Sequence, residues 1–166
     1  MKLIAHLEDL FWPEESIETL RFTARVFIRN KEGKYAFLRI VGEDILGVRN
    51  HLETCGGGVE VDETFLDAAI REVQEEIGYT AKHYCLLGCI IDRLNPIRRM
   101  TCSVFFEAEV DVQLSENNRT EEEKILIDQV VWLHPDEAIR QFRTAESKID
   151  AWVHRRDLRE IGRAHV

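Results

Sequence analysis

Acidic side chains gather around one arginine in residues 57–79, where the chain reads GGVEVDETFLDAAIREVQEEIGY. Arg71 and Glu72 are adjacent, and Glu75 and Glu76 follow one helical turn later. Carboxylate oxygens at this density suit a hard divalent cation such as Mg²⁺, which is typically held by one or two carboxylates together with the phosphates of a substrate. The segment therefore indicates metal-assisted chemistry on a phosphate compound.

The same segment carries the signals of a helix that would place these acids together. Thr64 followed three residues later by Asp67 is a capping-box pattern, and Gly78 is a natural residue to follow a last turn, so a helix is predicted from about Phe65 to Ile77. At about 100° per residue, the three glutamates after the arginine share one stripe beside the apolar face. Like charges at this spacing destabilise a helix by about a few tenths of a kcal/mol per pair, which a bound cation would offset. The alternative interpretation is a solvated acidic face.

Seven residues of this segment stand in the register of the Nudix box, whose pattern is Gly, five residues, Glu, seven residues, then Arg-Glu-apolar-any-Glu-Glu-any-Gly-apolar. They are Gly57, Glu63, Arg71, Glu72, Glu75, Glu76 and Gly78. The chain therefore resembles the Nudix hydrolases, and Tyr79 stands where an aliphatic residue is usual. The resemblance extends over roughly residues 20–142. It implies an α/β fold, specifically an α/β/α sandwich with a mixed β-sheet, and hydrolysis of a nucleoside diphosphate linked to another moiety.

The resemblance also assigns roles to individual residues of the box. The candidate ligands for Mg²⁺, or alternatively Mn²⁺, are the backbone carbonyl of Gly56 and the carboxylates of Glu72, Glu75 and Glu76. Glu72 and Glu75 are also candidates for the general base. Arg71 lies one turn before Glu75 and is expected to pair with it and fix its orientation.

Other candidate site residues lie outside the box. Residues 121–123 are three consecutive glutamates, and a glutamate on a later loop is the general base in some members of the family. Glu122, the central one, is the candidate here, and a solvated turn is the alternative interpretation. Arg25 and Arg39, on the first two predicted strands, are candidates for binding a substrate phosphate.

The rest of the chain predicts the strands and helices of one α/β domain. Strands are expected at residues 21–29, 35–41, 84–91, 100–110 and 129–133, with a hairpin turn at 30–34, and helices at 135–142 and 147–161. Residues 1–20 carry little pattern. They are interpreted as an extension that either opens with a short helix near Trp12 and Pro13 or packs on a second subunit in a homodimer.

Length and composition predict a single domain over residues 1–166. The net charge of −9, from 22 basic and 31 acidic residues, argues against a broad nucleic-acid-binding surface. No apolar stretch approaches the roughly 18 residues that would span a bilayer, and no secretory signal pattern is seen, so a cytoplasmic protein without a membrane partner is expected. The four cysteines lack zinc-ligand spacing and are expected to be core thiols: Cys55, Cys85, Cys89 and Cys102.

The expected function is metal-dependent hydrolysis of the pyrophosphate linkage in a small nucleotide, such as a nucleoside triphosphate, ADP-ribose or a nucleotide sugar. Two alternatives remain. One is a Nudix-fold isomerase of the isopentenyl diphosphate type, which usually departs from the complete box. The other is a non-catalytic nucleotide-sensing module, in which the glutamates of the box are commonly lost. The complete box in this chain favours the hydrolase.

Overall fold

A single mixed sheet of seven strands organises the structure, a computed structural model that describes residues 1–116 and 118–164, except for the side chains of Glu122 and residues 162–164. The strand order is β1-β5-β6-β2-β4-β3-β7. The strands are β1 (Leu3–Leu7), β2 (Thr19–Arg29), β3 (Tyr35–Asp44), β4 (Gly47–Gly58), β5 (Tyr79–Leu94), β6 (Arg99–Gln113) and β7 (Ile127–Leu133). The helices are α1 (Phe65–Glu72), its π-helical continuation η1 (Val73–Ile77), the 3₁₀ turn η2 (Asn95–Ile97), α2 (Glu121–Leu126), α3 (Pro135–Phe142) and α4 (Lys148–Ala164).

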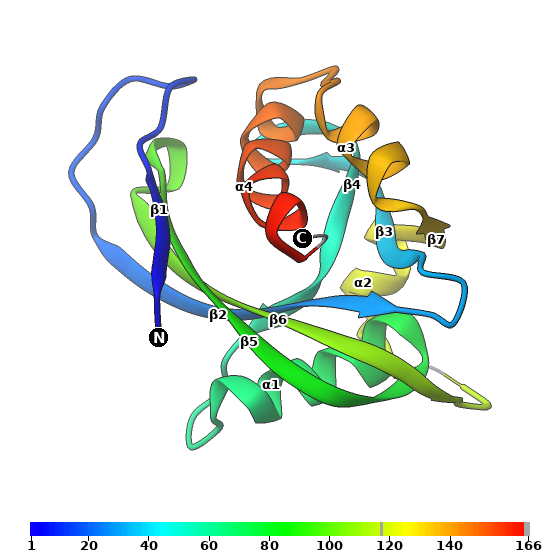
Figure 1. Cartoon of the computed structure of the whole chain (residues 1–166). Coiled ribbons are helices and arrows are strands. Elements are labelled where there is room, and N and C mark those ends of the chain that lie inside the picture. The colour runs from blue at the N-terminus through cyan, green and yellow to red at the C-terminus, as the bar shows by residue number, and fades with distance from the viewer. Residues whose placement is uncertain (117, 165–166) are drawn as a thin grey trace.

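Helices cover both faces of this sheet. Helix α1 lies on one side of the long strands β5 and β6, and α3 and α4 lie on the other side (Figure 1). Alternate residues of β2 divide between the two layers, since Val26 packs in the core beneath α1 and Phe27 packs in the core beneath α3 and α4. The predicted α/β/α sandwich with a mixed sheet is therefore confirmed.

Strand β2 lies at the centre of the sheet and sets the position of the glycine run that precedes α1. It pairs parallel with β6 and antiparallel with β4, with Arg25 opposite Gly56. Gly56 has a φ of 139°, and a Cβ at this position would lie only 2.1 Å from the carbonyl oxygen of Ala24. Only glycine allows the two strands to approach so closely here.

The expected strands and helices are all present, but two elements differ from the sequence interpretation. Strand β4 was not predicted, because its sequence GVRNHLETCGGG is polar and rich in glycine. Two of its polar residues, His51 and Thr54, are nevertheless buried, because Asp150 and Asp157 of α4 accept hydrogen bonds from them. Residues 1–20 contribute strand β1, which pairs parallel with β5 of the same chain. The described residues 8–18 form no helix, so the short helix expected near Trp12 and Pro13 is wrong.

Other expectations concern cysteines and membrane segments. All four thiols are free, and Cys55 and Cys89 are buried while Cys102 is half-buried. Cys85 is exposed, so the expectation of a core thiol is wrong at that position. Among the residues described, no helix is long and apolar enough to cross a membrane.

Candidate functional site

Helix α1 begins as the sequence predicts and ends in a wider turn. The hydroxyl of Thr64 accepts a hydrogen bond from the Asp67 amide at 3.1 Å, and the Asp67 carboxylate accepts one from the Thr64 amide at 3.2 Å. This reciprocal cap satisfies two amides of the first turn. Residues 73–77 continue as a π-helix, whose hydrogen bonds span five residues, and Gly78 ends it with a φ of 76°. The predicted helical segment is therefore correct in extent, although its last turn is not α-helical.

Three carboxylates meet on the buried side of this helical segment. Glu72 is 4% exposed and Glu76 is 6% exposed, and both lie next to Glu123 from helix α2. One oxygen from each of the three carboxylates lies within 4.8 Å of the others. We call these three residues the carboxylate triad. A set of hard oxygen donors at this spacing fits a divalent cation such as Mg²⁺.

Burial makes the charges of the carboxylate triad unfavourable in the absence of a cation. Burial and then the neighbouring charge of Glu72 raise the pKa of Glu76 to about 8, although the Gly56 amide opposes the shift by donating a hydrogen bond at 2.7 Å. Burial also raises the pKa of Glu72, and Arg71 opposes that change. A bound cation would stabilise both ionised forms. The electrostatics of the site therefore fit a metal centre.

Arg71 orients the acidic residues around the carboxylate triad. Its Nη1 donates to Glu72 Oε1 at 2.8 Å and to Glu75 Oε2 at 3.0 Å. Its Nε donates to Glu63 Oε1 at 2.9 Å, and its Nη2 donates to the Gly58 carbonyl at 2.9 Å. The geometry agrees with the expected pairing of Arg71 with Glu75. It also shows that every nitrogen of the guanidinium is used within the protein.

The structure brings together only part of the site expected from the sequence. Glu75 pairs with Arg71 and lies outside the carboxylate triad, and Gly56 contacts Glu76 through its amide. The side chain of Glu122 lies outside the described residues, and Glu123 is the acid of α2 that joins the triad. A sequence signal for Glu123 exists, because Thr120 followed by Glu123 is a second capping box, which holds this side chain at the start of α2.

The two arginines expected to bind phosphate lie in different places. Arg25 is buried, and its Nη1 lies 2.9 Å from the Thr54 carbonyl oxygen and 2.6 Å from Glu53 Oε1. Arg39 donates from Nη2 to Gln141 Oε1 at 3.1 Å and lines a separate pocket next to α3. The structure therefore does not place the two side chains around one ligand.

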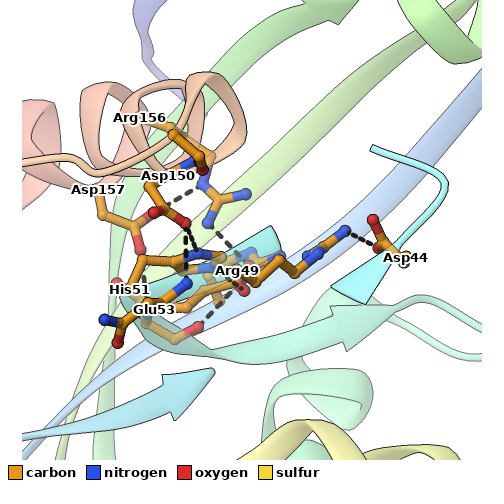
Figure 2. Close-up of polar contacts among 11 residues, drawn as sticks. Asp44, Arg49, His51, Glu53, Asp150, Arg156 and Asp157 are labelled. Atoms are coloured by element: carbon orange, nitrogen blue, oxygen red, sulfur yellow. Dashed lines mark hydrogen bonds and ion pairs between the residues drawn. The ribbon is translucent and has the colours of Figure 1, made fainter. Parts of the chain in front are cut away.

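A buried network of charges joins helix α4 to strand β4. Figure 2 shows Arg156 and Asp157 of α4 directed at β4, where Arg156 Nη2 lies 3.1 Å from Glu53 Oε1. Arg156 Nε also donates to Asp157 Oδ1 at 2.7 Å. Burial alone would raise the pKa of Glu53, but Arg25, His51 and Arg156 hold it well below its ordinary value. The network therefore keeps Glu53 ionised next to the cavity that Arg25 lines.

A second buried carboxyl group, that of Asp92, has no such pairing. It is 1% exposed, and neither oxygen accepts a hydrogen bond from a residue that the structure describes. Burial raises the pKa of Asp92 to about 6, against the opposing charges of Arg156, Arg25 and Arg99. Because the pKa in the folded state exceeds the ordinary value of 3.8, the folded protein holds the proton more tightly than the unfolded chain. This contribution to stability is present below about pH 4 and is lost as the pH rises through about 6.

Asp92→Asn should remove this loss of stability. A shift of about two pKa units corresponds to about 3 kcal/mol, so near pH 7.5 the variant should be more stable than the wild type by up to that amount. Urea unfolding with chelator, at several pH values between 4 and 8, measures the difference. Asp128→Asn, at an exposed position of β7, is the control. Parallel pH profiles for Asp92→Asn and the wild type would contradict this account.

Comparisons with known proteins agree with the fold and the box. A family model described as the NUDIX domain matches residues 19–153. The fold is similar to that of a NUDIX hydrolase from Nitrosomonas europaea, with a TM-score of 0.67 and 18% identity over 89% of this chain and 90% of that chain. It is also similar to a MutT protein from Methanosarcina mazei Go1, with a TM-score of 0.61 and 18% identity over 92% and 99% of the two chains. No curated protein sequence matches the chain. Since the family model covers most of its length, the chain belongs to the Nudix family.

Proposed function

We propose that this protein is a Mg²⁺-dependent hydrolase that cleaves the pyrophosphate linkage of a nucleoside diphosphate joined to another moiety. The observation that carries the proposal is the carboxylate triad of Glu72, Glu76 and Glu123, whose oxygens lie within 4.8 Å of one another. Three buried or half-buried carboxylates at this spacing repel one another unless a cation lies between them. Mn²⁺ is the alternative ion.

The contacts of the site residues suggest a separate role for each of them. When bound, the metal would neutralise charge that develops on the phosphoryl oxygens and would activate a water molecule. Glu72 and Glu76 would hold the ion, and Arg71 would keep Glu72 and Glu75 in fixed orientations. Glu75 is partly exposed and Glu123 comes from a different helix, so both remain candidates for the general base.

A substrate panel with product analysis tests this function. Nucleoside triphosphates, ADP-ribose, nucleotide sugars and dinucleoside polyphosphates would be incubated with Mg²⁺, with Mn²⁺ or with chelator. We expect turnover of one class only when the divalent ion is present, and mass spectrometry of the products would locate the broken bond. Isomerisation of isopentenyl diphosphate without hydrolysis, or equal turnover in chelator, would contradict the proposal. Binding of nucleotides without turnover would favour the sensing module.

Replacement of Glu123 by glutamine tests its role as general base. Gln at this position can still cap α2, but it cannot take a proton, so turnover should fall about 100-fold or more and the acidic limb of the pH profile should disappear. Steady-state rates between pH 5 and 9 measure both effects. Glu121→Gln is the control, since Glu121 is exposed and pairs with Lys124. Glu122→Gln should be measured in the same series, because the sequence indicates Glu122 as a candidate general base.

The outcome distinguishes a base from a ligand. If Glu123 only holds the metal, Glu123→Gln should weaken the response to Mg²⁺ and leave the acidic limb in place. If Glu75 is the base, the limb should disappear instead in Glu75→Gln.

A further inference from the structure

Five arginines converge on one cavity beside the carboxylate triad. The cavity has a volume of about 120 Å³ and is bounded by β2, β4, β6 and α4. Its guanidinium groups come from distant parts of the sequence: Arg21, Arg25, Arg49, Arg99 and Arg156. The chain as a whole is acidic, with a net charge of −9, so a cluster of five cations in one place is unusual for it. We call it the arginine cavity.

The carboxylates near the arginine cavity do not engage all five cations. Glu53 forms ion pairs with Arg25 and Arg156 and with none of the other three arginines. Arg49 forms an ion pair with Asp44. Within the described part of the chain, the side chains of Arg21 and Arg99 have no hydrogen bond and no ion pair. The charge of Asp92 acts on Arg99, but neither of its oxygens accepts a hydrogen bond from a described residue.

Unused donors in the walls of the cavity point to an occupant that accepts hydrogen bonds. The Nε atoms of Arg25, Arg49 and Arg99 and the hydroxyl of Thr101 are buried, and none of them has a hydrogen-bond partner among the described residues. In folded proteins the large majority of buried polar groups are paired, so several exceptions around one cavity require an explanation. A phosphate group offers only strong acceptors in its dianionic form, and arginine binds it through two parallel hydrogen bonds.

Arg21 of the arginine cavity and Glu72 of the carboxylate triad both lie next to the glycine run that ends β4. A Cβ on Gly58 would lie 3.5 Å from Nη2 of Arg21. A Cβ on the neighbouring Gly57 would lie 2.4 Å from an oxygen of Glu72. The charge of Glu72 acts on Arg21, so the two places are close enough to interact electrostatically. Apolar residues, including Leu94 and Trp152, form another part of the wall, and such a lining strengthens electrostatic attraction inside the cavity.

We propose that the arginine cavity binds a phosphate group of the substrate that is separate from the diphosphate cleaved at the carboxylate triad. This inference rests on the proposed hydrolase function and makes it more specific. The preferred substrate then carries a further phosphate, and the arginines select it over analogues that lack this group.

Binding of inorganic phosphate in the presence of chelator tests the cavity independently of catalysis. Calorimetric titration would compare the wild type with Arg99→Met and with Thr101→Val. We expect the affinity for phosphate to fall about tenfold in Arg99→Met, which loses a charged donor, and about threefold in Thr101→Val, which loses a neutral one. The buried Nε of Arg99 and the hydroxyl of Thr101 have no hydrogen-bond partner among the described residues to lose, so both variants should fold. Arg143→Met, at an exposed position, is the control and should bind phosphate as the wild type does.

Two results of this titration would overturn the proposal. One is the absence of phosphate binding to the wild type. The other is an equal affinity in all four proteins, which would place the anion elsewhere. Because no metal and no turnover are needed, either result stands apart from a failure of the hydrolase proposal.

Steady-state kinetics then test whether the phosphate bound in the arginine cavity belongs to the substrate. With a substrate from the active class, inorganic phosphate should raise the apparent KM without changing kcat, and Arg99→Met should weaken this inhibition. For two substrates that differ by one remote phosphate, such as ADP-ribose and its 2′-phosphate, KM should be about tenfold lower for the phosphorylated one, and Arg99→Met should remove the difference. Inhibition that lowers kcat alone, or equal KM values in the wild type, would overturn the assignment of the cavity to substrate.

Discussion

Glu76→Gln should lower metal-dependent turnover by about a thousandfold or more while the protein remains folded. The substitution keeps the shape of the side chain and an oxygen that can accept the 2.7 Å hydrogen bond from the Gly56 amide. It removes one negative charge from the carboxylate triad, and with it much of the attraction for a divalent ion. Steady-state rates across a range of Mg²⁺ concentrations measure the loss.

The stability of the same variant supplies a second readout. Since the pKa of Glu76 in the folded state is about 8, against an ordinary value of 4.5, the metal-free wild type should lose stability as the pH rises from about 4.5 to about 8. Glu76→Gln should lack this loss in chelator. Mg²⁺ should raise the melting temperature of the wild type, because it binds the folded state, and should raise that of the variant much less.

Two matched variants complete this test. Glu60→Gln changes an exposed acid of the same box and should behave as the wild type does. Glu75→Gln tests the ligand role that the resemblance implies for a residue outside the triad. Full turnover in Glu76→Gln, or an equal effect of Mg²⁺ on its melting temperature, would rule out the proposed metal centre.

The helical part of the site was predictable because its signals are local. The cap formed by Thr64 and Asp67 and the left-handed Gly78 each depend on a few neighbouring residues, so sequence alone gave the extent of the segment. The π-helical turn was not predictable in this way. Within this segment Glu76 is buried with Glu72, and Glu75 pairs with Arg71.

The rest of the site depends on contacts between distant segments. The sequence of strand β4 is typical of a loop because it is polar. Its polar side chains pair with residues of α4, which lie about 100 residues later in the chain, and a local pattern cannot indicate such pairs. Arg25 and Arg39 look equivalent in sequence, since both are charged residues within apolar strands. The structure separates them, because Arg25 lines the arginine cavity and Arg39 contacts α3.

Arg156→Met should destabilise the protein by about 3 to 5 kcal/mol, since it breaks a buried ion pair from one side. Arg156 is 3% exposed and is held by Glu53 and by Asp157. Methionine fills similar space but leaves both carboxylates without this partner in a site that excludes water. For a chain of this length, the loss corresponds to a fall in melting temperature of about 6 to 20 °C. Thermal unfolding at pH 7 in chelator measures the change.

The charges of the network, rather than the packing of helix α4, should account for most of this effect. Arg159→Met makes the same substitution at an exposed position of α4, and its melting temperature should stay close to that of the wild type. Adding Asp157→Asn to Arg156→Met should recover part of the stability, because it removes one unpaired carboxylate and keeps an acceptor for the Thr54 amide, 2.8 Å away. If the double variant is instead less stable than Arg156→Met, Asp157 stabilises β4 through contacts other than its pairing with Arg156.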